Sequence, residues 1–568
     1  MSLRLIFILG IVFFSWYGMI GASTANAADP ASRKKCLSVL RAGLRADPFW
    51  PAMHAAEALT AIGETSDVKK RLAQQWKTCE SDQQLCGLAR ELVRAGDDSY
   101  AGMLSYKLAD PNSTGRVHAA ESLFKLNRLG DEATLRRAAQ SSDRGLRQMA
   151  LAALARSGDA DARRQIVADL RSQDKTARRR AAWFLSVIGA PSDLEPLRAA
   201  YRKATDPLEK AQLEHTLATL GDASATAALF ENLTSEVAAI RANAAYYAGA
   251  ARATQAAPAL LDLLEDPETD VAIRAAGSWL QLQTDPIKPT PAKAPAKAVD
   301  YLRAAAAKMA PDQRMQYATV DGQTLDLHLF QPADWKPTDM RPCLIAIHGG
   351  GWSGGEPRRL FPICERFKSR GMVAISIEYR LLNPRKGITV FDSVSDAQRA
   401  VRHIRRHADQ LGIDPQKIVV CGASAGGHLA VGCALFDQDE EPSKAPQASA
   451  TPNALALLYP VIDTSPAGYG ANKIGDRWRE LSPVDHVRAG MPPTILLHGT
   501  GDPVTPFAGA KRFDQAMKEA GNRCDFHVND GGIHGYFMYD LGLYYEALEQ
   551  LETFFTSLQW LPHDASPE

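Results

Sequence analysis

The chain has no excess of either charge, because 65 Lys and Arg residues stand against 65 Asp and Glu residues. A nucleic-acid partner held chiefly by electrostatic attraction is therefore not expected. The eight cysteines include no C-x-x-C pair, which disfavours a zinc site. Beyond the N-terminal segment, no apolar run is long enough to span a bilayer. These absences favour an ordinary globular protein without a metal.

The N-terminal segment differs sharply from the rest of the chain. Arg4 is followed by a run from Leu5 to Ile20 that is almost wholly apolar, and Ala25–Ala27 supplies an A-x-A cleavage pattern. These features are typical of a secretory signal peptide. We expect residues 1–27 to be removed and the mature protein to be exported, periplasmic or secreted. The alternative is a membrane anchor that stays uncleaved.

At 568 residues the chain is long enough for two or three domains. Residues 28–285 are rich in Ala and Leu and carry almost no strand signal. Related segments within this region end at glycines 31 to 33 residues apart, as at Gly158, Gly189 and Gly221. A glycine of this kind ends a helix, and an aspartate that follows it caps the next one. The period predicts a solenoid of about eight helical hairpins.

These hairpins resemble short HEAT-like repeats, which implies a surface that binds a protein partner. Arg178–Arg180 then form a solvated helix face, with an anion site as the less favoured alternative. Residues 286–312 follow as a Pro, Ala and Lys linker with a lead-in helix from Tyr301 to Met309. Such a linker is extended and semi-rigid, so we expect the two domains to sit apart.

Two glycine-rich motifs dominate residues 313–562, before a tail at 563–568. Gly422–Gly427 is a G-x-S-x-G nucleophile elbow, and the HGGG loop His348–Gly351 begins 76 residues before Ser424. Each motif follows an apolar run that is typical of a buried strand. A serine on a sharp strand-to-helix turn is exposed and lies at the helix N-terminus, where negative charge is favoured. We predict Ser424 as the nucleophile.

Backbone N–H groups on the glycine loop and just after the nucleophile are suited to bind an oxyanion. We predict Gly350, Gly351 and Ala425 as these donors. The acid and the base should follow the serine in that order. Asp502 lies just after a late apolar strand, and His534 lies in a glycine-flanked loop before the last helix. They are the predicted acid and base.

Other acidic and histidine residues compete for these roles. Asp463 follows another apolar strand and is the main alternative for the acid. Loop and strand positions favour structural or solvated roles for the rest, namely Asp485, Asp530, His428, His498 and His527. We expect His348 to orient its own loop. The sequence therefore indicates one triad of Ser424, His534 and Asp502.

Residues from about 315 to 562 resemble the α/β-hydrolase fold in its hormone-sensitive-lipase-like and acetyl (xylan) esterase branch. The motifs already given carry the resemblance, together with Glu378–Leu381 and, more weakly, Tyr459–Asp463. Many lipase-like members have aspartate where this chain has Ala423, which disfavours a close lipase assignment. The resemblance implies a mostly parallel central sheet with flanking helices, behind an all-α solenoid.

The resemblance also implies a carbohydrate esterase that removes acetyl or feruloyl groups from polysaccharides. We expect short-chain acyl esters, because the connection from Asp463 to Ser482 leaves little room for a large lid. The two-step acyl transfer that the triad implies requires no cofactor and no metal. Trp352 and Trp478 are candidates for the pocket wall, with a packing role as an equal alternative for either. Two alternatives stay open: a repeat scaffold with a vestigial hydrolase domain, and a serine peptidase or amidase.

Overall fold

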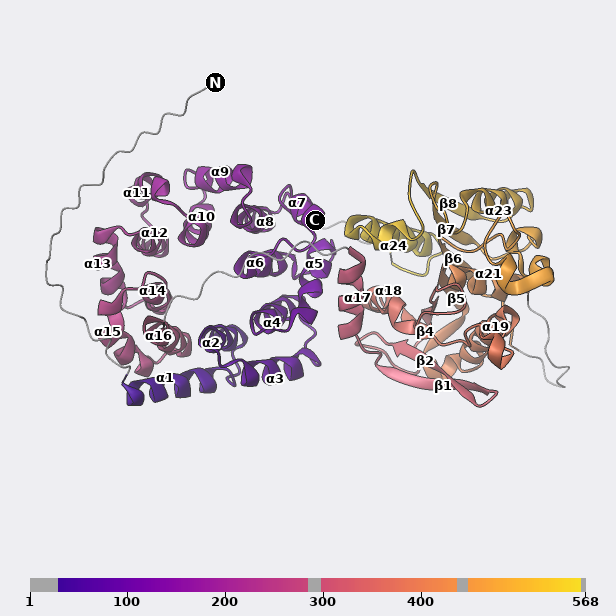
Figure 1. Cartoon of the computed structure of the whole chain (residues 1–568), viewed down its shortest axis with the longest axis horizontal. Coiled ribbons are helices and arrows are strands. Elements are labelled where there is room, and N and C mark those ends of the chain that lie inside the picture. The colour runs from indigo at the N-terminus through magenta and orange to yellow at the C-terminus, as the bar shows by residue number, and fades with distance from the viewer. Residues whose placement is uncertain (1–28, 285–297, 437–447, 563–568) are drawn as a thin grey trace, which may run out of the picture.

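A computed structural model describes residues 29–284, 298–436 and 448–562. The predicted signal peptide, residues 286–297 of the linker and the C-terminal tail lie outside these residues. Figure 1 shows an all-helical domain beside a domain built on a central sheet. The eight cysteines are all free thiols.

The helical domain contains eight hairpins, as the period predicts. One helix of each hairpin lies on the outside: α1 (Pro30–Gly43), α3 (Thr65–Trp76), α5 (Ala101–Ala109), α7 (Glu132–Ala138), α9 (Ala160–Asp169), α11 (Leu194–Tyr201), α13 (Ala223–Asn232) and α15 (Ala257–Asp262). The other lies on the inside: α2 (Phe49–Ala61), α4 (Asp82–Arg94), α6 (Arg116–Leu126), α8 (Arg144–Arg156), α10 (Lys175–Ile188), α12 (Pro207–Thr219), α14 (Ala238–Ala250) and α16 (Thr269–Leu282).

Aspartates and glycines set the hairpin boundaries as expected. Asp159 accepts hydrogen bonds from two N–H groups at the start of α9, and Asp222 does the same for α13. Gly158 and Gly221 have φ values of 108° and 89°, a conformation that glycine adopts without strain. Local capping therefore fixes where each repeat begins and ends.

The solenoid closes into a ring, which the sequence did not indicate (Figure 1). The last inner helix, α16, packs against α1 and α2 at the other end of the domain. Small residues allow the close approach, since a Cβ on Gly277 would lie 2.8 Å from Cβ of Ala58. His54 Nδ1 and Asp270 Oδ1, 2.6 Å apart, also join the two ends.

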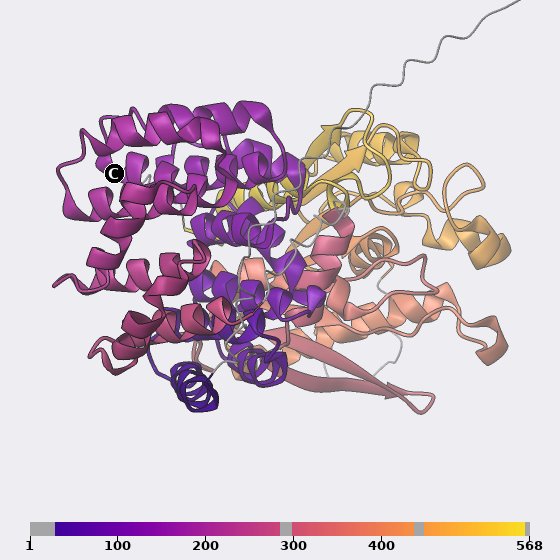
Figure 2. The ribbon, with the colours of Figure 1, turned by 60° about the vertical axis from the view of Figure 1, so that its left-hand side comes forward.

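The second domain has one eight-stranded sheet in the order β1-β2-β4-β3-β5-β6-β7-β8. Its strands are β1 (Gln313–Val320), β2 (Gln323–Phe330), β3 (Arg341–Ile347), β4 (Val373–Ile377), β5 (Ile413–Ala423), β6 (Ala454–Leu458), β7 (Thr494–Gly499) and β8 (Cys524–Asn529). The β1–β2 and β2–β4 pairs are antiparallel, and the remaining pairs are parallel. Figure 2 shows β1 and β2 as a long hairpin, whose turn has positive φ at Asp321 and Gly322.

Helices cover both faces of this sheet. One face packs against α19 (Val390–Arg406), α21 (Ala425–Leu435) and α23 (Phe507–Glu519). The other packs against α18 (Phe361–Ser369) and α24 (Leu541–Ser557). Two short helices, α20 (Ala408–Leu411) and α22 (Ala471–Ile474), lie in connections. The observed architecture is an α/β-hydrolase fold behind an all-α solenoid.

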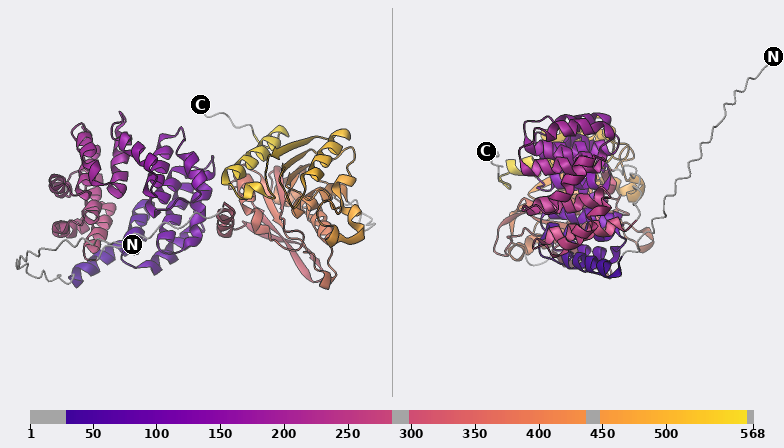
Figure 3. Two further views of the ribbon diagram at one scale, coloured as in Figure 1. Left: turned by 45° about the horizontal axis from the view of Figure 1, so that its top comes forward. Right: turned by 90° about the vertical axis from the view of Figure 1, so that its left-hand side faces the viewer.

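The two domains do not sit apart, so that expectation is wrong. Helix α17 (Ala298–Lys308), the predicted lead-in helix, packs on α5, and a Cβ on Gly102 would lie 2.7 Å from Cβ of Ala304. Tyr545 on α24 donates a hydrogen bond of 3.0 Å to the carbonyl oxygen of Tyr106 on α5. The left panel of Figure 3 shows α17 between the ring and the sheet. One continuous apolar core therefore runs from the ring to the sheet.

Candidate active site

Ser424 lies on the sharp turn between β5 and α21, at φ 55° and ψ −119°. A non-glycine residue at positive φ is strained, and the glycines around it permit the tight turn. A Cβ on Gly422 would lie 2.1 Å from the carbonyl oxygen of Gly426. A Cβ on Gly426 would lie 2.1 Å from the carbonyl oxygen of Ile347. The backbone of Ser424 is fixed on both sides, since its N–H donates to Leu458 and its C=O accepts from Val461.

The three predicted triad residues lie in one hydrogen-bonded chain. His534 Nε2 is 2.9 Å from Ser424 Oγ, and His534 Nδ1 is 2.8 Å from Asp502 Oδ2. Asp502 follows β7, and His534 lies in the loop between β8 and α24. This arrangement has a nucleophile, a base within reach of its proton and a carboxylate that orients the base.

Asp502 is held as a carboxylate by several donors. Its Oδ1 accepts the N–H groups of Val504 and Thr505, and its Oδ2 accepts the Thr505 hydroxyl at 2.8 Å. Burial alone would raise the pKa of Asp502, but hydrogen bonds from His534 and Thr505 outweigh it and lower the pKa. Thr505 is a functional residue that the motifs do not indicate, and its position three residues after the predicted carboxylate is the one signal for it in the sequence.

The HGGG loop follows β3 directly and lies beside the nucleophile elbow. Gly350 and Gly351 have φ values of 132° and 58°, which suit glycine. Among the described residues, the N–H groups of Gly350, Gly351 and Ala425 have no recorded backbone acceptor. Ala425 is the first residue of α21, where N–H groups lack partners within the helix. The described backbone therefore leaves the three predicted donors without an acceptor, and their role stays a prediction.

Comparison with known proteins gives two family matches that divide the chain as the structure does. The BD-FAE family model matches residues 326–517, and a model described as HEAT repeats matches residues 132–218. Esterase LipQ of Mycobacterium tuberculosis is 29% identical over 215 residues, which cover 34% of this chain and 50% of that protein. Endo-1,4-beta-xylanase B of Butyrivibrio fibrisolvens is 29% identical over 206 residues, covering 34% of this chain and 32% of that protein.

Among solved structures, esterase 2 of Thermogutta terrifontis is 39% identical, with 45% of this chain and 96% of that chain covered and a TM-score of 0.42. The chain belongs to the α/β-hydrolase esterases. It spans about half the length of the curated Mycobacterium relatives that it matches. The catalytic domain is that of a carboxylic ester hydrolase, and the helical domain of this esterase consists of HEAT-like repeats.

In this esterase a segment between β6 and β7 holds the glycine loop from outside. Lys473 Nζ donates hydrogen bonds to the carbonyl oxygen of Gly351 at 2.9 Å and to the hydroxyl of Tyr469 at 2.8 Å. Sequence reasoning missed both side chains, because nothing in the spacing of the segment shows which residues turn back toward the loop. They position the predicted oxyanion donors without touching the triad.

The expected pocket role of Trp352 needs correction. Its indole is fully buried, and it packs edge-on against His428 and tilted against Tyr469. Trp352 therefore supports the loop from beneath and does not line an open pocket in this structure. Trp478 is half-buried on a 3-10 helical turn, where its carbonyl oxygen accepts from Thr464.

The competing residues have other partners. Asp463 Oδ2 lies 2.5 Å from Nη2 of Arg512, outside the hydrogen-bonded chain of Ser424. His348 stacks on Tyr379, and burial lowers its pKa to about 4. His428 lies 2.7 Å from the carbonyl oxygen of Leu481 through Nε2, and burial likewise lowers its pKa to about 4. Both histidines are neutral at pH 7 and structural.

The described residues offer no metal site. Within them, no group of three or more His, Cys, Asp or Glu side chains could hold a metal ion. The chemistry available here is that of a serine, an imidazole, a carboxylate and three backbone N–H groups.

Proposed function

We propose that the whole chain is an exported serine esterase that cleaves short-chain acyl esters, such as acetyl or feruloyl groups on polysaccharides. One observation carries this proposal: the chain of 2.9 Å and 2.8 Å contacts from Ser424 through His534 to Asp502. The triad is accompanied by the N–H groups of Gly350, Gly351 and Ala425, which have no backbone acceptor among the described residues.

The proposed mechanism is acyl transfer in two steps. His534 takes the hydroxyl proton as Ser424 Oγ attacks the ester carbonyl, and Asp502 orients the imidazole. The N–H groups of Gly350, Gly351 and Ala425 stabilise the oxyanion of the tetrahedral intermediate. His534 then gives the proton to the leaving alcohol. A water molecule attacks the acyl-enzyme in the same way and releases the acid.

The surroundings of the triad support a small acyl group. Only a four-residue helix and a 3-10 turn lie between Asp463 and Ser482, so this described connection forms no large lid over the site. Val504 and Ile533, which flank Asp502 and His534 in sequence, expose apolar side chains beside the catalytic groups. The similarity to a protein named as a xylanase supports a polysaccharide as the carrier of the ester.

Export rests on the N-terminal segment, which lies outside the described residues. Within the described ranges, no helix has both the length and the apolar character needed to cross a membrane. If the segment is a signal peptide, N-terminal sequencing of the secreted protein should begin at Ala28. A protein that starts at Met1 and sediments with membranes would show that the segment is an uncleaved anchor, and a protein found in the cytoplasm would contradict export.

The decisive experiment compares hydrolysis of 4-nitrophenyl acetate by the mature chain and by its Ser424→Ala variant. We expect the variant to lose at least 10³-fold in kcat, while its thermal unfolding stays close to that of the parent. Equal rates in both proteins would overturn the proposal. A fluorophosphonate probe should label the parent and not the variant; an unlabelled parent would favour the vestigial-domain alternative.

An ester and an amide with the same acyl group separate esterase from amidase activity. We expect the aryl acetate to be cleaved faster than the corresponding anilide, and the acetate faster than a long-chain ester. A protein partner for the helical repeats stays a prediction.

A further inference from the structure

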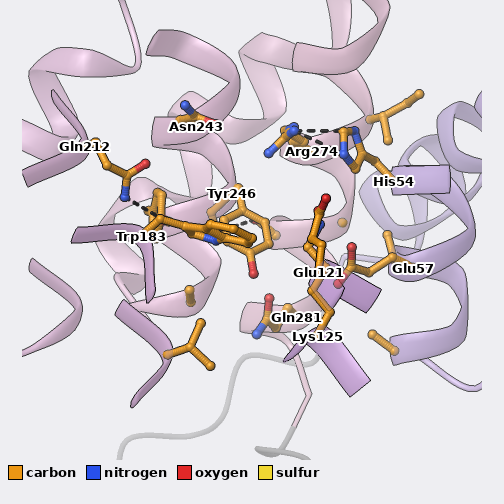
Figure 4. Close-up of a pocket in the computed structure, with 18 of the residues that line it drawn as sticks. His54, Glu57, Glu121, Lys125, Trp183, Gln212, Asn243, Tyr246, Arg274 and Gln281 are labelled. Carbon is orange, nitrogen blue, oxygen red and sulfur yellow. Dashed lines mark hydrogen bonds and ion pairs between the residues drawn. The ribbon is translucent and has the colours of Figure 1, made fainter. Parts of the chain in front are cut away.

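The closed ring encloses a cavity of about 1050 Å³ in the helical domain, remote in the fold from the triad. All eight inner helices contribute to its wall, and Figure 4 shows side chains that converge on it from several of them. Ligand pockets commonly measure about 300–1,000 Å³, so this cavity has room for a ligand of several rings. We call it the lumen.

The lumen is strongly basic although the whole chain carries no net charge. Seven Arg and Lys residues line it, against two carboxylates, those of Glu57 and Glu121. Like charges that are brought together in a concave site repel one another and attract an anion. This concentration favours a negatively charged ligand.

Several of these cations have no carboxylate partner in the described part of the chain. Arg179 is exposed toward the lumen and has no recorded hydrogen bond or ion pair. Arg156 donates only to the carbonyl oxygens of Phe124 and Lys125. Arg178, by contrast, turns away and pairs with Glu209. The arginine cluster that the sequence favours as a solvated face is therefore split, and part of it points into the lumen.

Aromatic and amide side chains share the same wall. Trp183 and Tyr246 lie within it, with Asn243 and Gln281 around them (Figure 4). Tyr246 is 38% exposed, yet desolvation and the charge of Glu57 raise its pKa. Tyr246 therefore lines the interior of the ring and stays accessible to a ligand there. The lumen thus offers flat apolar faces next to hydrogen-bonding groups.

The two carboxylates are fixed in their ionised form. Burial would raise the pKa of each, but Arg94, Lys125 and other cations outweigh it and lower the pKa of Glu57 and of Glu121 to about 2. Glycosidic cleavage needs one carboxylic acid that is protonated near neutral pH. Neither residue meets this need, so the lumen is suited to binding and not to cleavage.

We propose that the lumen binds a carboxylate-bearing oligosaccharide. The C–H face of a sugar ring packs on an aromatic side chain, and its hydroxyls bind amides and carboxylates. Its acidic groups match guanidinium forks, which bind carboxylates with paired hydrogen bonds. The inference does not depend on the esterase mechanism, because the lumen and the triad lie in different domains. It assigns the helical domain a carbohydrate-holding role.

Trigalacturonate is a suitable probe, because it has three acidic sugar rings and no ester. We expect isothermal titration of the mature full-length chain to give a Kd of about 10–100 µM, which weakens as salt screens the charges. Xylotriose, which has no charge, and inorganic phosphate, which has no sugar ring, should each bind at least tenfold more weakly. No heat with millimolar trigalacturonate would overturn the proposal, as would equal affinity for either comparison ligand.

Two variants place the binding in the lumen. Arg179→Ala and Tyr246→Ala remove exposed side chains, so the ring should still fold, and each should weaken binding about tenfold or more. Arg171→Ala removes an exposed arginine that does not line the lumen and should bind like the parent. Hydrolysis of 4-nitrophenyl acetate should be unchanged in all three variants. Undiminished binding by both lumen variants would show that the oligosaccharide binds elsewhere.

Discussion

Lys473 Nζ lies 2.9 Å from the carbonyl oxygen of Gly351 and ties the segment between β6 and β7 to the glycine loop. The fit is close, since a Cβ on Gly351 would lie 2.7 Å from this nitrogen and 2.4 Å from the Tyr469 hydroxyl. Because the N–H of the same glycine is a proposed oxyanion donor, the position of that donor depends on Lys473.

We therefore expect Lys473→Met to lower kcat for 4-nitrophenyl acetate about tenfold, with little change in KM. Methionine keeps the apolar stem but loses the ammonium group, so the loop can move when the oxyanion forms. Steady-state kinetics measure both constants. Lys417→Met, in the N-terminal part of β5, is the matched control and should behave like the parent. A rise in KM alone would instead assign Lys473 to substrate binding.

Thr505 acts on the carboxylate end of the triad. Its hydroxyl donates to Asp502 Oδ2 and also lies 3.2 Å from His534 Nδ1. Thr505→Val should lower kcat about tenfold and raise the pKa of Asp502, since it removes a donor that lowers it. Thr505→Ser keeps the hydroxyl and should restore kcat; failure to do so would leave Thr505 as a packing residue.

The sequence predicted the parts of the site that are set by local chemistry. Ser424 needs glycines on its own turn, and Asp502 and His534 lie at the expected places after late strands. The backbone around the elbow is decided within a few residues, so the motif and the geometry agree. The elbow helix begins at Ala425, directly after the nucleophile, which is its N-cap residue.

The parts that were missed depend on contacts between distant segments. Ring closure involves Gly43 and Gly277, which look like any small residues of an alanine-rich helix. Likewise, Trp352 was expected in the pocket because it follows the oxyanion loop, but Tyr469, from the later segment, covers it. Sequence spacing carries no signal for packing of this kind.

Ring closure can be tested with the substitution Gly277→Ala, which adds one methyl group to α16. Gly277→Ala would stabilise an isolated helix by about 1 kcal/mol, but here the added Cβ lies 2.8 Å from Cβ of Ala58. We expect urea unfolding to show a net loss of about 1–3 kcal/mol. The double variant with Ala58→Gly removes the clash and should be more stable than the sum of the single changes. Simple additivity would show that α16 and α2 do not pack in solution.

The contact between the domains has an ion pair at its centre. Arg366 on α18 is buried and donates to Glu552 on α24 at 2.5 Å and to Asp110 after α5 at 3.2 Å. Arg366→Ala removes the cation that Glu552 and Asp110 share, although Glu552 keeps Arg370 at 3.7 Å, and should cost about 3–5 kcal/mol of unfolding free energy. The comparison is Arg477→Ala, since solvent screens the exposed Arg477–Glu480 pair and its loss should change stability little. Equal small losses would indicate that the domains separate in solution.

His215 makes the ring sensitive to acid. It is fully buried in α12, and burial lowers its pKa to about 3. The unfolded chain takes up this proton near pH 6.5, whereas the folded chain resists it. Stability is therefore complete above that pH and falls as the pH drops toward 3, by about 1.4 kcal/mol per pH unit from this group. His215→Leu removes this contribution, so the stability gap between variant and parent should shift by about 2 kcal/mol in favour of the variant from pH 7 to pH 5. Urea unfolding at several pH values measures the gap, and parallel curves would show that His215 is not the group that titrates on unfolding.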